Sequence, residues 1–176
     1  IFKAFKRKET FATTGTRIAI RFFGGYNLSS IDLNSEMLVS QAYQNGVTMG
    51  SDLVGDDDKT PEFIVWAQRD KNGAPLQRVQ IIKGWIDASG RTHEKVFDVV
   101  CSDGLQVDPV TYRCPDNGAK VNINDCSITQ NVGSAELKTI WIDPEFDNET
   151  KSFYYARVLE NPTCRWSTWD AITRGF

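Results

Sequence analysis

The stretch from Leu76 to Val100 reads LQRVQIIKGWIDASGRTHEKVFDVV and predicts a β-hairpin. In its first arm Val79, Ile81 and Trp85 are separated by even numbers of residues, so they lie on one face of an extended strand. The segment Asp87-Ala88-Ser89-Gly90 supplies the turn. The return arm again places its apolar residues on one side. We therefore expect two antiparallel strands that share an apolar face.

Strand patterns also occur on both sides of this hairpin. They cover residues 17–23 and 62–67 before it, and 137–142 and 153–160 after it. One internal helix is predicted over 35–43. Strands at this spacing, without alternating long helices, are typical of an antiparallel sandwich. The fold class we expect is mainly β: an antiparallel β-sandwich with one or two short helices and an N-terminal helical stub.

The composition is that of an ordinary globular protein. Of 176 residues, 40% are hydrophobic and 24% are charged, which excludes a disordered or collagenous chain. The net charge of −3 lacks the basic excess that nucleic-acid binding proteins carry. No apolar run approaches the ~20 residues of a membrane helix. We therefore expect no nucleic-acid partner and no membrane insertion.

The single histidine, His93, limits the chemistry available to the chain. Histidine supplies most general bases and many zinc ligands in proteins. His93 lies on the return arm of the hairpin, and its local sequence offers neither a nucleophile nor an orienting acid. We interpret it as an exposed strand residue, and we predict no catalytic residue, no metal ligand and no cofactor in this chain.

The four cysteines form an even set without a CxxC pair, which does not favour a zinc ribbon. Most of them lie near loop signals, where a bridge would restrain the connection. We expect at least one disulfide and an exported protein, periplasmic or extracellular; buried free thiols in a reducing compartment are the alternative. Four cysteines allow three complete pairings, which the sequence leaves open. The candidates are Cys101, Cys114, Cys126 and Cys164.

A polar segment follows the helical stub and offers hydroxyl groups, a flexible glycine and a guanidinium. Backbone N–H groups and arginine suit phosphate or carboxylate, so this segment could face an anion or a substrate. A plain helix-to-strand connection is the alternative. The candidate residues are Thr13, Thr14, Gly15 and Arg17.

Aromatic residues near the two ends of the chain indicate a contact surface. Two tryptophans lie three residues apart, beside a helix start that we expect at Ser167 or Thr168. Two phenylalanines lie on one side of the helical stub, which needs something to pack against. The alternative for the tryptophans is a platform for sugar rings. The candidate contact residues toward a missing domain are Phe2, Phe5, Arg165, Trp166 and Trp169.

Acidic residues offer two weaker cation candidates. Asp56-Asp57-Asp58 could hold a cation, although a solvated loop is the simpler interpretation. The alternating acids of 143–149 resemble the start of a calcium loop, but Asn148 stands where an EF-hand needs glycine. We therefore predict no EF-hand.

Four stretches together resemble one family of large bacterial exported proteins of unknown function. They are FATTGTRI at 11–18, PLQRVQIIKGW at 75–85, DPEFD at 143–147 and FYYARVLENPTCRW at 153–166. The front part of that family resembles the PHP (polymerase and histidinol phosphatase) metallo-phosphoesterases. The resemblance implies that the chain is a C-terminal piece of such a protein.

The same resemblance implies how the chain is divided. Residues 1–15 would be the tail end of a preceding PHP-like domain, its last helix and exit loop, and 16–176 a β-sandwich C-terminal domain. The family's metal ligands would lie upstream of residue 1, so none is carried over. Thr16 stands where the family's exit has proline, while Arg17 is retained.

The function implied is that of a non-catalytic C-terminal β domain of an exported, metal-dependent (phospho)hydrolase of unknown substrate. Its partner would be its own N-terminal domain, which would hold the divalent metal. Two alternatives stay open. One is a carbohydrate- or ligand-binding β-sandwich module. The other is a hydrolase that uses two carboxylates within this chain, as glycosidases do.

Overall fold

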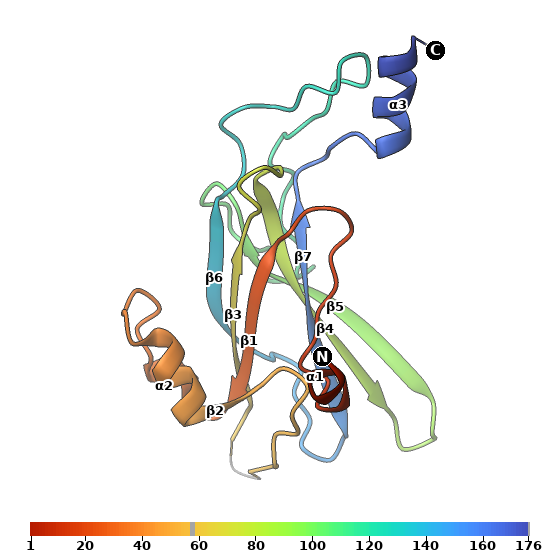
Figure 1. Cartoon of the computed structure of the whole chain (residues 1–176). Helices are drawn as coiled ribbons and strands as arrows, with labels where there is room; N and C mark the ends of the chain where they lie inside the picture. Colours follow the sequence, from red (N-terminus) through yellow and green to blue (C-terminus); the bar gives the residue numbers. More distant parts are fainter. Residues whose placement is uncertain (57–58, 176) are drawn as a thin grey trace.

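A computed structural model describes residues 1–56 and 59–175 of the chain (Figure 1). Its elements in chain order are α1 (Phe2–Lys6), β1 (Ala19–Gly25), the short 3₁₀ helix η1 (Leu28–Ser30), α2 (Leu38–Asn45), β2 (Gly46–Thr48), β3 (Glu62–Gln68), β4 (Leu76–Ile86), β5 (Thr92–Cys101), β6 (Glu136–Ile142), β7 (Ser152–Glu160) and α3 (Trp166–Arg174).

The strands form two antiparallel sheets, which confirms the predicted mainly β fold and is consistent with a β-sandwich (Figure 1). One sheet has the strand order β2-β1-β3-β6, and the other has the order β5-β4-β7. All strand pairs are antiparallel. Strands β6 and β7 are therefore edge strands of different sheets.

The predicted hairpin is confirmed and lies at the centre of the smaller sheet. Strand β4 pairs with β5 on one edge and with β7 on the other. Val79 and Ile81 are fully buried between the sheets, and Phe97 lies opposite Ile81 on β5. The register shifts between Val79 and Gln80, a bulge that the alternation of the sequence does not predict.

Two hydrophobic clusters lie on opposite faces of the larger sheet. The first fills the space between the sheets, and its buried members are Phe22, Phe63, Val65, Ala67, Leu76, Val79, Ile81 and Leu137. The second lies under α2, and its buried members are Phe23, Leu28, Ile31, Leu38, Ala42 and Ile64. Neighbouring residues of β1 and β3 thus point to different clusters, because successive side chains of a strand alternate between its faces.

Three boundaries differ from the sequence prediction. Helix α2 begins at Leu38, because the Ser35 hydroxyl accepts the Met37 N–H and holds that residue in a turn. Gly24 and Gly25 belong to β1, where the Asn45 carbonyl lies 2.8 Å from the position of a Cβ on Gly25. Helix α3 begins at Trp166, without the side-chain cap that we expected from a serine or threonine.

All four cysteines are paired, so the prediction of a disulfide is confirmed. Cys101–Cys114 holds the segment that follows β5 against the end of that strand. Cys126–Cys164 ties the long connection before β6 to the residues that precede α3. Within the described residues, no helix is long and apolar enough to cross a membrane.

Two of the three isoleucines of β4, Ile81 and Ile86, differ in burial and give a matched test of the core. Ile81 is fully buried, whereas Ile86 is 57% exposed. We expect Ile81→Ala to lower the free energy of unfolding by about 2–5 kcal/mol, since it removes buried methylenes and leaves a cavity. Ile86→Ala should change it by less than about 0.5 kcal/mol. Urea denaturation of both variants measures the difference, and equal losses would contradict this description of the core.

Candidate functional site

A pocket of about 620 Å³ lies between the two sheets, because residues of both line it. Phe22 and Gly24 of β1 and Phe63 of β3 contribute from the larger sheet. Tyr154 of β7 contributes from the smaller one. The segment 47–53, which follows α2 in the chain, forms a further part of the lining.

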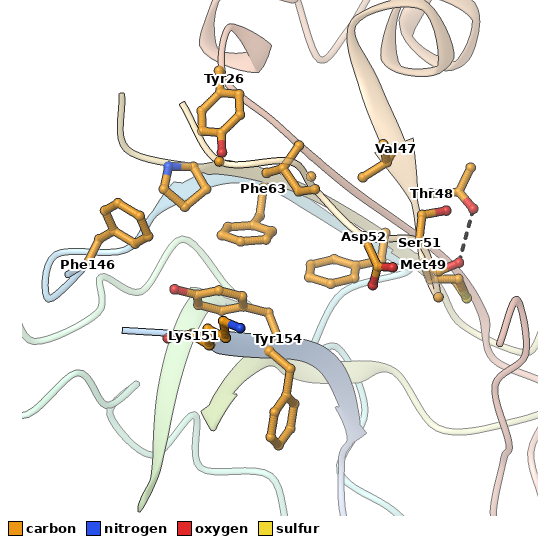
Figure 2. Close-up of a pocket in the computed structure, with 18 of the residues that line it drawn as sticks. Tyr26, Val47, Thr48, Met49, Ser51, Asp52, Phe63, Phe146, Lys151 and Tyr154 are labelled. Carbon is orange, nitrogen blue, oxygen red and sulfur yellow. Dashed lines mark hydrogen bonds between the residues drawn. The ribbon is translucent and has the colours of Figure 1, made fainter. Parts of the chain in front are cut away.

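Aromatic rings form the inner part of this pocket. Phe63 and Tyr154 face each other from the two sheets, with ring centroids 4.5 Å apart (Figure 2). The Phe22 ring stacks on that of Phe63, with centroids 5.7 Å apart. Trp141, which does not line the pocket, has its ring centroid 5.8 Å from that of Phe63. Phe146 extends the lining from the loop between β6 and β7 (Figure 2). An apolar ring or the flat face of a sugar fits walls of this kind.

The end of α1 reaches the rim of the pocket. Gly50, which has a φ of +86°, lies so close to this segment that a Cβ on it would be 2.3 Å from the Arg7 carbonyl oxygen. Lys8 follows and lines the pocket. On another part of the rim, the Tyr26 hydroxyl donates a hydrogen bond to the Val54 carbonyl at 2.8 Å.

A buried ion pair lies behind the ring of Tyr154. The Lys83 ammonium is 2.6 Å from Asp143 Oδ2, and the two residues are 5% and 3% exposed. The Tyr154 hydroxyl donates to the same carboxylate oxygen at 2.7 Å. Lys83 Nζ also donates to the Glu145 carbonyl at 2.6 Å, and Asp143 Oδ1 accepts the Glu145 N–H at 2.9 Å. Each charge thus has its counter-charge and further hydrogen bonds.

Burial, together with the hydrogen bond to Asp143, raises the pKa of Tyr154 above its ordinary value. The phenol therefore stays protonated at physiological pH, and its proton is directed at Asp143. Tyr154 offers a bound molecule its ring face. In this arrangement the phenol is not placed to act as a general base, because its proton is held by Asp143.

The described lining of the pocket carries few charged groups. Lys8 and Lys151 are its cations, and Asp52 is the one acidic side chain among its described residues. Within residues 1–56 and 59–175, no group of three or more histidine, cysteine, aspartate or glutamate residues is placed to hold a metal ion.

The predicted anion-facing residues lie outside this pocket. Thr13, Thr14, Gly15 and Arg17 belong to an exposed connection between α1 and β1. The Arg17 N–H donates to Asp70 Oδ2 at 2.9 Å. Hydrogen bonds from the Asn72 N–H and the Arg17 N–H lower the pKa of the Asp70 carboxyl. An anion on this segment would therefore lie beside a carboxylate. Anion binding here stays a prediction.

The predicted contact residues lie in two separate places. Phe2 and Phe5 are exposed on α1, whereas Trp166 and Trp169 are exposed on α3, which begins directly after Arg165. Figure 1 shows α3 beyond one end of the sheets and α1 nearer the other end. A partner domain that used both places would make two contacts, and this role stays a prediction.

His93 is an exposed residue of β5, as the sequence predicts. Its ring stacks on Trp85, and its Nε2 lies 2.8 Å from Asp87 Oδ2. Hydrogen bonds from Ser89 and His93 lower the pKa of Asp87. Of the acidic run that begins at Asp56, residues 57 and 58 lie outside the described part of the chain.

Sequence reasoning missed Lys83, Asp143 and Tyr154 as a unit. The signal for Lys83 is present, because it lies on β4 between Ile81 and Trp85 in the same alternation. A lysine at an inward position of a strand needs a buried counter-charge. The partner, however, lies 60 residues further along the chain, and only the packing of the strands shows which acid it is.

Comparison with known proteins identifies a family but not an activity. A family model described as "Protein of unknown function (DUF3604)" matches the chain over residues 1–176. No curated protein and no solved structure matches it. The match confirms the prediction of a family of unknown function.

Separating the buried ion pair should destabilise the fold. We expect Lys83→Met to lower the free energy of unfolding by about 3–5 kcal/mol, because it leaves Asp143 buried without a counter-charge. The double variant Lys83→Met/Asp143→Leu should recover most of this loss, and Lys71→Met, at an exposed position, serves as control. Chemical denaturation measures all three. A loss below about 1 kcal/mol for Lys83→Met would show that the pair is not buried in solution.

The raised pKa of Tyr154 also makes a prediction at alkaline pH. The unfolded chain releases this phenolic proton near pH 10, whereas the folded chain retains it to higher pH. This contribution to stability is therefore complete below pH 10 and is lost as the pH rises above it, by at most about 1.4 kcal/mol per pH unit. We expect the unfolding free energy of the wild type to fall more steeply above pH 10 than that of Tyr154→Phe. Parallel slopes would contradict the raised pKa of Tyr154, which burial and the hydrogen bond to Asp143 cause.

Proposed function

We propose that this chain, which belongs to the DUF3604 family of proteins of unknown function, is a non-catalytic β domain. It flanks the active-site domain of an exported, metal-dependent hydrolase and contributes a ligand pocket to it. The active-site domain is the PHP-like one implied by the sequence motifs. In this proposal residues 1–15 are its last helix and exit loop, 16–176 are the β domain, and the divalent metal is held upstream of residue 1.

The observation that carries the proposal is the contact between α1 and the pocket rim. The segment that would lead in from the preceding domain ends at Arg7 and Lys8, directly against Gly50. Lys8 itself lines the pocket. A domain that precedes α1 is therefore joined to the β-sandwich at the pocket. A molecule bound between the sheets would lie beside that junction.

The pocket gives less support to a hydrolase contained within this chain. Such an enzyme needs two acids that face each other across a cleft. Among the described residues of the lining, Asp52 has no second acid opposite it. Asp143 lies behind Tyr154, where Lys83 neutralises its charge. These contacts favour a binding role over catalysis by carboxylates.

Two disulfides support export, because such bonds persist in oxidising compartments. Together they use every cysteine of the chain. A periplasmic or extracellular location, with the chain's own N-terminal domain as its partner, completes the proposed function.

A second candidate function, binding of a carbohydrate, is favoured by the outer face of β7. Phe153 and Tyr155 stack there with their ring planes 13° apart, and they are 61% and 43% exposed. Exposed aromatic rings with nearly parallel planes offer faces on which sugar rings stack. The tryptophans of the sequence-based prediction lie elsewhere, on α3.

The proposed function is tested by two glycine variants of the full-length protein. A Cβ at Gly50 would clash with the backbone of Arg7 and Lys8, whereas Gly90, whose φ of +81° is similar to that of Gly50, has no atom within 4 Å of that position. We expect Gly50→Ala to lower kcat/KM for phosphoester hydrolysis with added divalent metal by about 10- to 100-fold, since it displaces the junction from the pocket. Gly90→Ala, in the turn between β4 and β5, should leave it unchanged.

The isolated 176-residue chain is assayed for phosphoester hydrolysis alongside the full-length protein. It should show no hydrolysis under the same conditions. Hydrolysis by this chain at a rate comparable to that of the full-length protein would overturn the proposal.

A further inference from the structure

A polar cluster lies on the outer face of the smaller sheet, away from the pocket. Its central residue is Asp98 of β5, which pairs with Gln80 of β4. Gln80 pairs in turn with Arg157 of β7. The neighbours Ala156 and Val158 pack against the core between the sheets, so Arg157 points to the other face. The cluster therefore faces outward across all three strands.

The carboxylate of Asp98 is fully buried and already has its hydrogen bonds. Oδ2 accepts from Arg78 Nη1 at 3.0 Å and from the Cys114 N–H at 2.7 Å. Oδ1 accepts from Gln80 Nε2 at 2.6 Å. Arg113 Nη1 lies 3.5 Å from the same Oδ1. A single guanidinium, that of Arg78, is enough to neutralise this charge.

Two further guanidinium groups lie beside Asp98 or its partner Gln80. Arg113 approaches Asp98 from the loop after β5, and Arg157 donates through Nε to Gln80 Oε1 at 2.8 Å. Two guanidinium groups thus contact the Asp98 carboxylate directly, and a third, that of Arg157, is linked to it through Gln80, so the cluster carries three positive charges and one negative charge. Structural compensation of Asp98 does not account for that excess of positive charge.

The guanidinium groups of Arg113 and Arg157 keep N–H donors that are free to bind a ligand. A guanidinium carries five N–H donors. In the described part of the chain, the Arg113 guanidinium has no hydrogen bond or ion pair other than its ion pair with Asp98, and the Arg157 guanidinium has none other than its hydrogen bond to Gln80. The side chain of Arg113 is 49% exposed, so its remaining donors reach solvent.

The loop that carries Arg113 is fixed in place on both sides. The next residue, Cys114, is bonded to Cys101 at the end of β5. On the other side, the Tyr112 carbonyl accepts the Asp98 N–H at 2.9 Å, and the Tyr112 ring packs on Phe97 at 5.0 Å. The backbone that carries this guanidinium is therefore held before any ligand arrives, which lowers the entropy cost of binding.

We propose that this arginine cluster, consisting of Arg78, Arg113 and Arg157, binds the phosphate or sulfate group of a ligand. Guanidinium groups match such tetrahedral oxyanions in charge and in fork geometry. Arg113 and Arg157 make the direct contacts, and Arg78 and Gln80 hold the surrounding groups in position. The site depends neither on the pocket nor on the preceding domain.

The test uses inorganic phosphate and inorganic sulfate as probes, with chloride at equal ionic strength as the reference. We expect phosphate or sulfate to raise the thermal unfolding temperature of the wild type in a saturable way, because a ligand that binds the folded state stabilises it. The variant Arg113→Gln/Arg157→Gln should bind the same anion at least about tenfold more weakly by calorimetry. Arg21→Gln, which removes an exposed strand arginine from the other sheet, should bind like the wild type.

Two results would overturn the proposal. One is equal affinity in the double variant and the wild type, and the other is no saturable response of the wild type beyond that to chloride. Circular dichroism checks the folding of the variants. If the double variant does not fold, the exposed single variant Arg157→Gln replaces it, with the same expected direction. The variant Arg113→Lys/Arg157→Lys keeps both positive charges but loses the planar guanidinium groups that can bind an oxyanion through two N–H donors. It should therefore bind the anion more weakly than the wild type.

Discussion

Strand β4 is largely buried on both faces and is paired along both edges. The other elements supply its strand partners, its apolar contacts and the hydrogen bonds of its buried polar side chains. Its inner face, with Val79 and Ile81, packs against the larger sheet. Its outer face, with Gln80 and Ile82, lies in a sheet of three strands, and the loop after β5 folds back against this face through the Cys114 N–H. A strand enclosed in this way can carry polar side chains only where partners meet them, since an unpartnered buried polar group is costly. The polar chemistry of the domain is therefore concentrated around β4.

Lys83 and Asp98, two of the buried charged groups around β4, are compensated in different ways. Lys83 has one counter-charge, Asp143, and the tyrosine above that pair belongs to the wall of the pocket. Asp98 is surrounded by more positive charge than its neutralisation needs. A balanced buried pair fixes geometry, whereas a surplus at the surface attracts an opposite charge from solution. This difference separates the aromatic pocket from the outer cluster, for which we propose an anionic ligand.

Much of the fold follows from local patterns, but the candidate site does not. The hairpin and the strands β3, β6 and β7 were predictable to within a residue or two, because alternation and turn residues act over short distances. Helix α2 was predicted three residues too early, because the Ser35 hydroxyl favours a turn over a first helical turn. The pocket joins Phe63 to Tyr154, and no local pattern encodes how two sheets pack. The sequence also left the pairing of the four cysteines open, because the pairing depends on how distant segments pack together.

The disulfide Cys126–Cys164 has a topological consequence, because β6 and β7 both lie between its two cysteines in the chain. The bond closes a covalent ring that contains one edge strand from each sheet. The layers of the sandwich are thus linked by a continuous loop of chain as well as by their shared core. A single peptide-bond cleavage in the connection between β6 and β7 would open the ring without releasing a fragment. Both sheets would stay tethered, and a nicked molecule would retain the pieces it needs to close again.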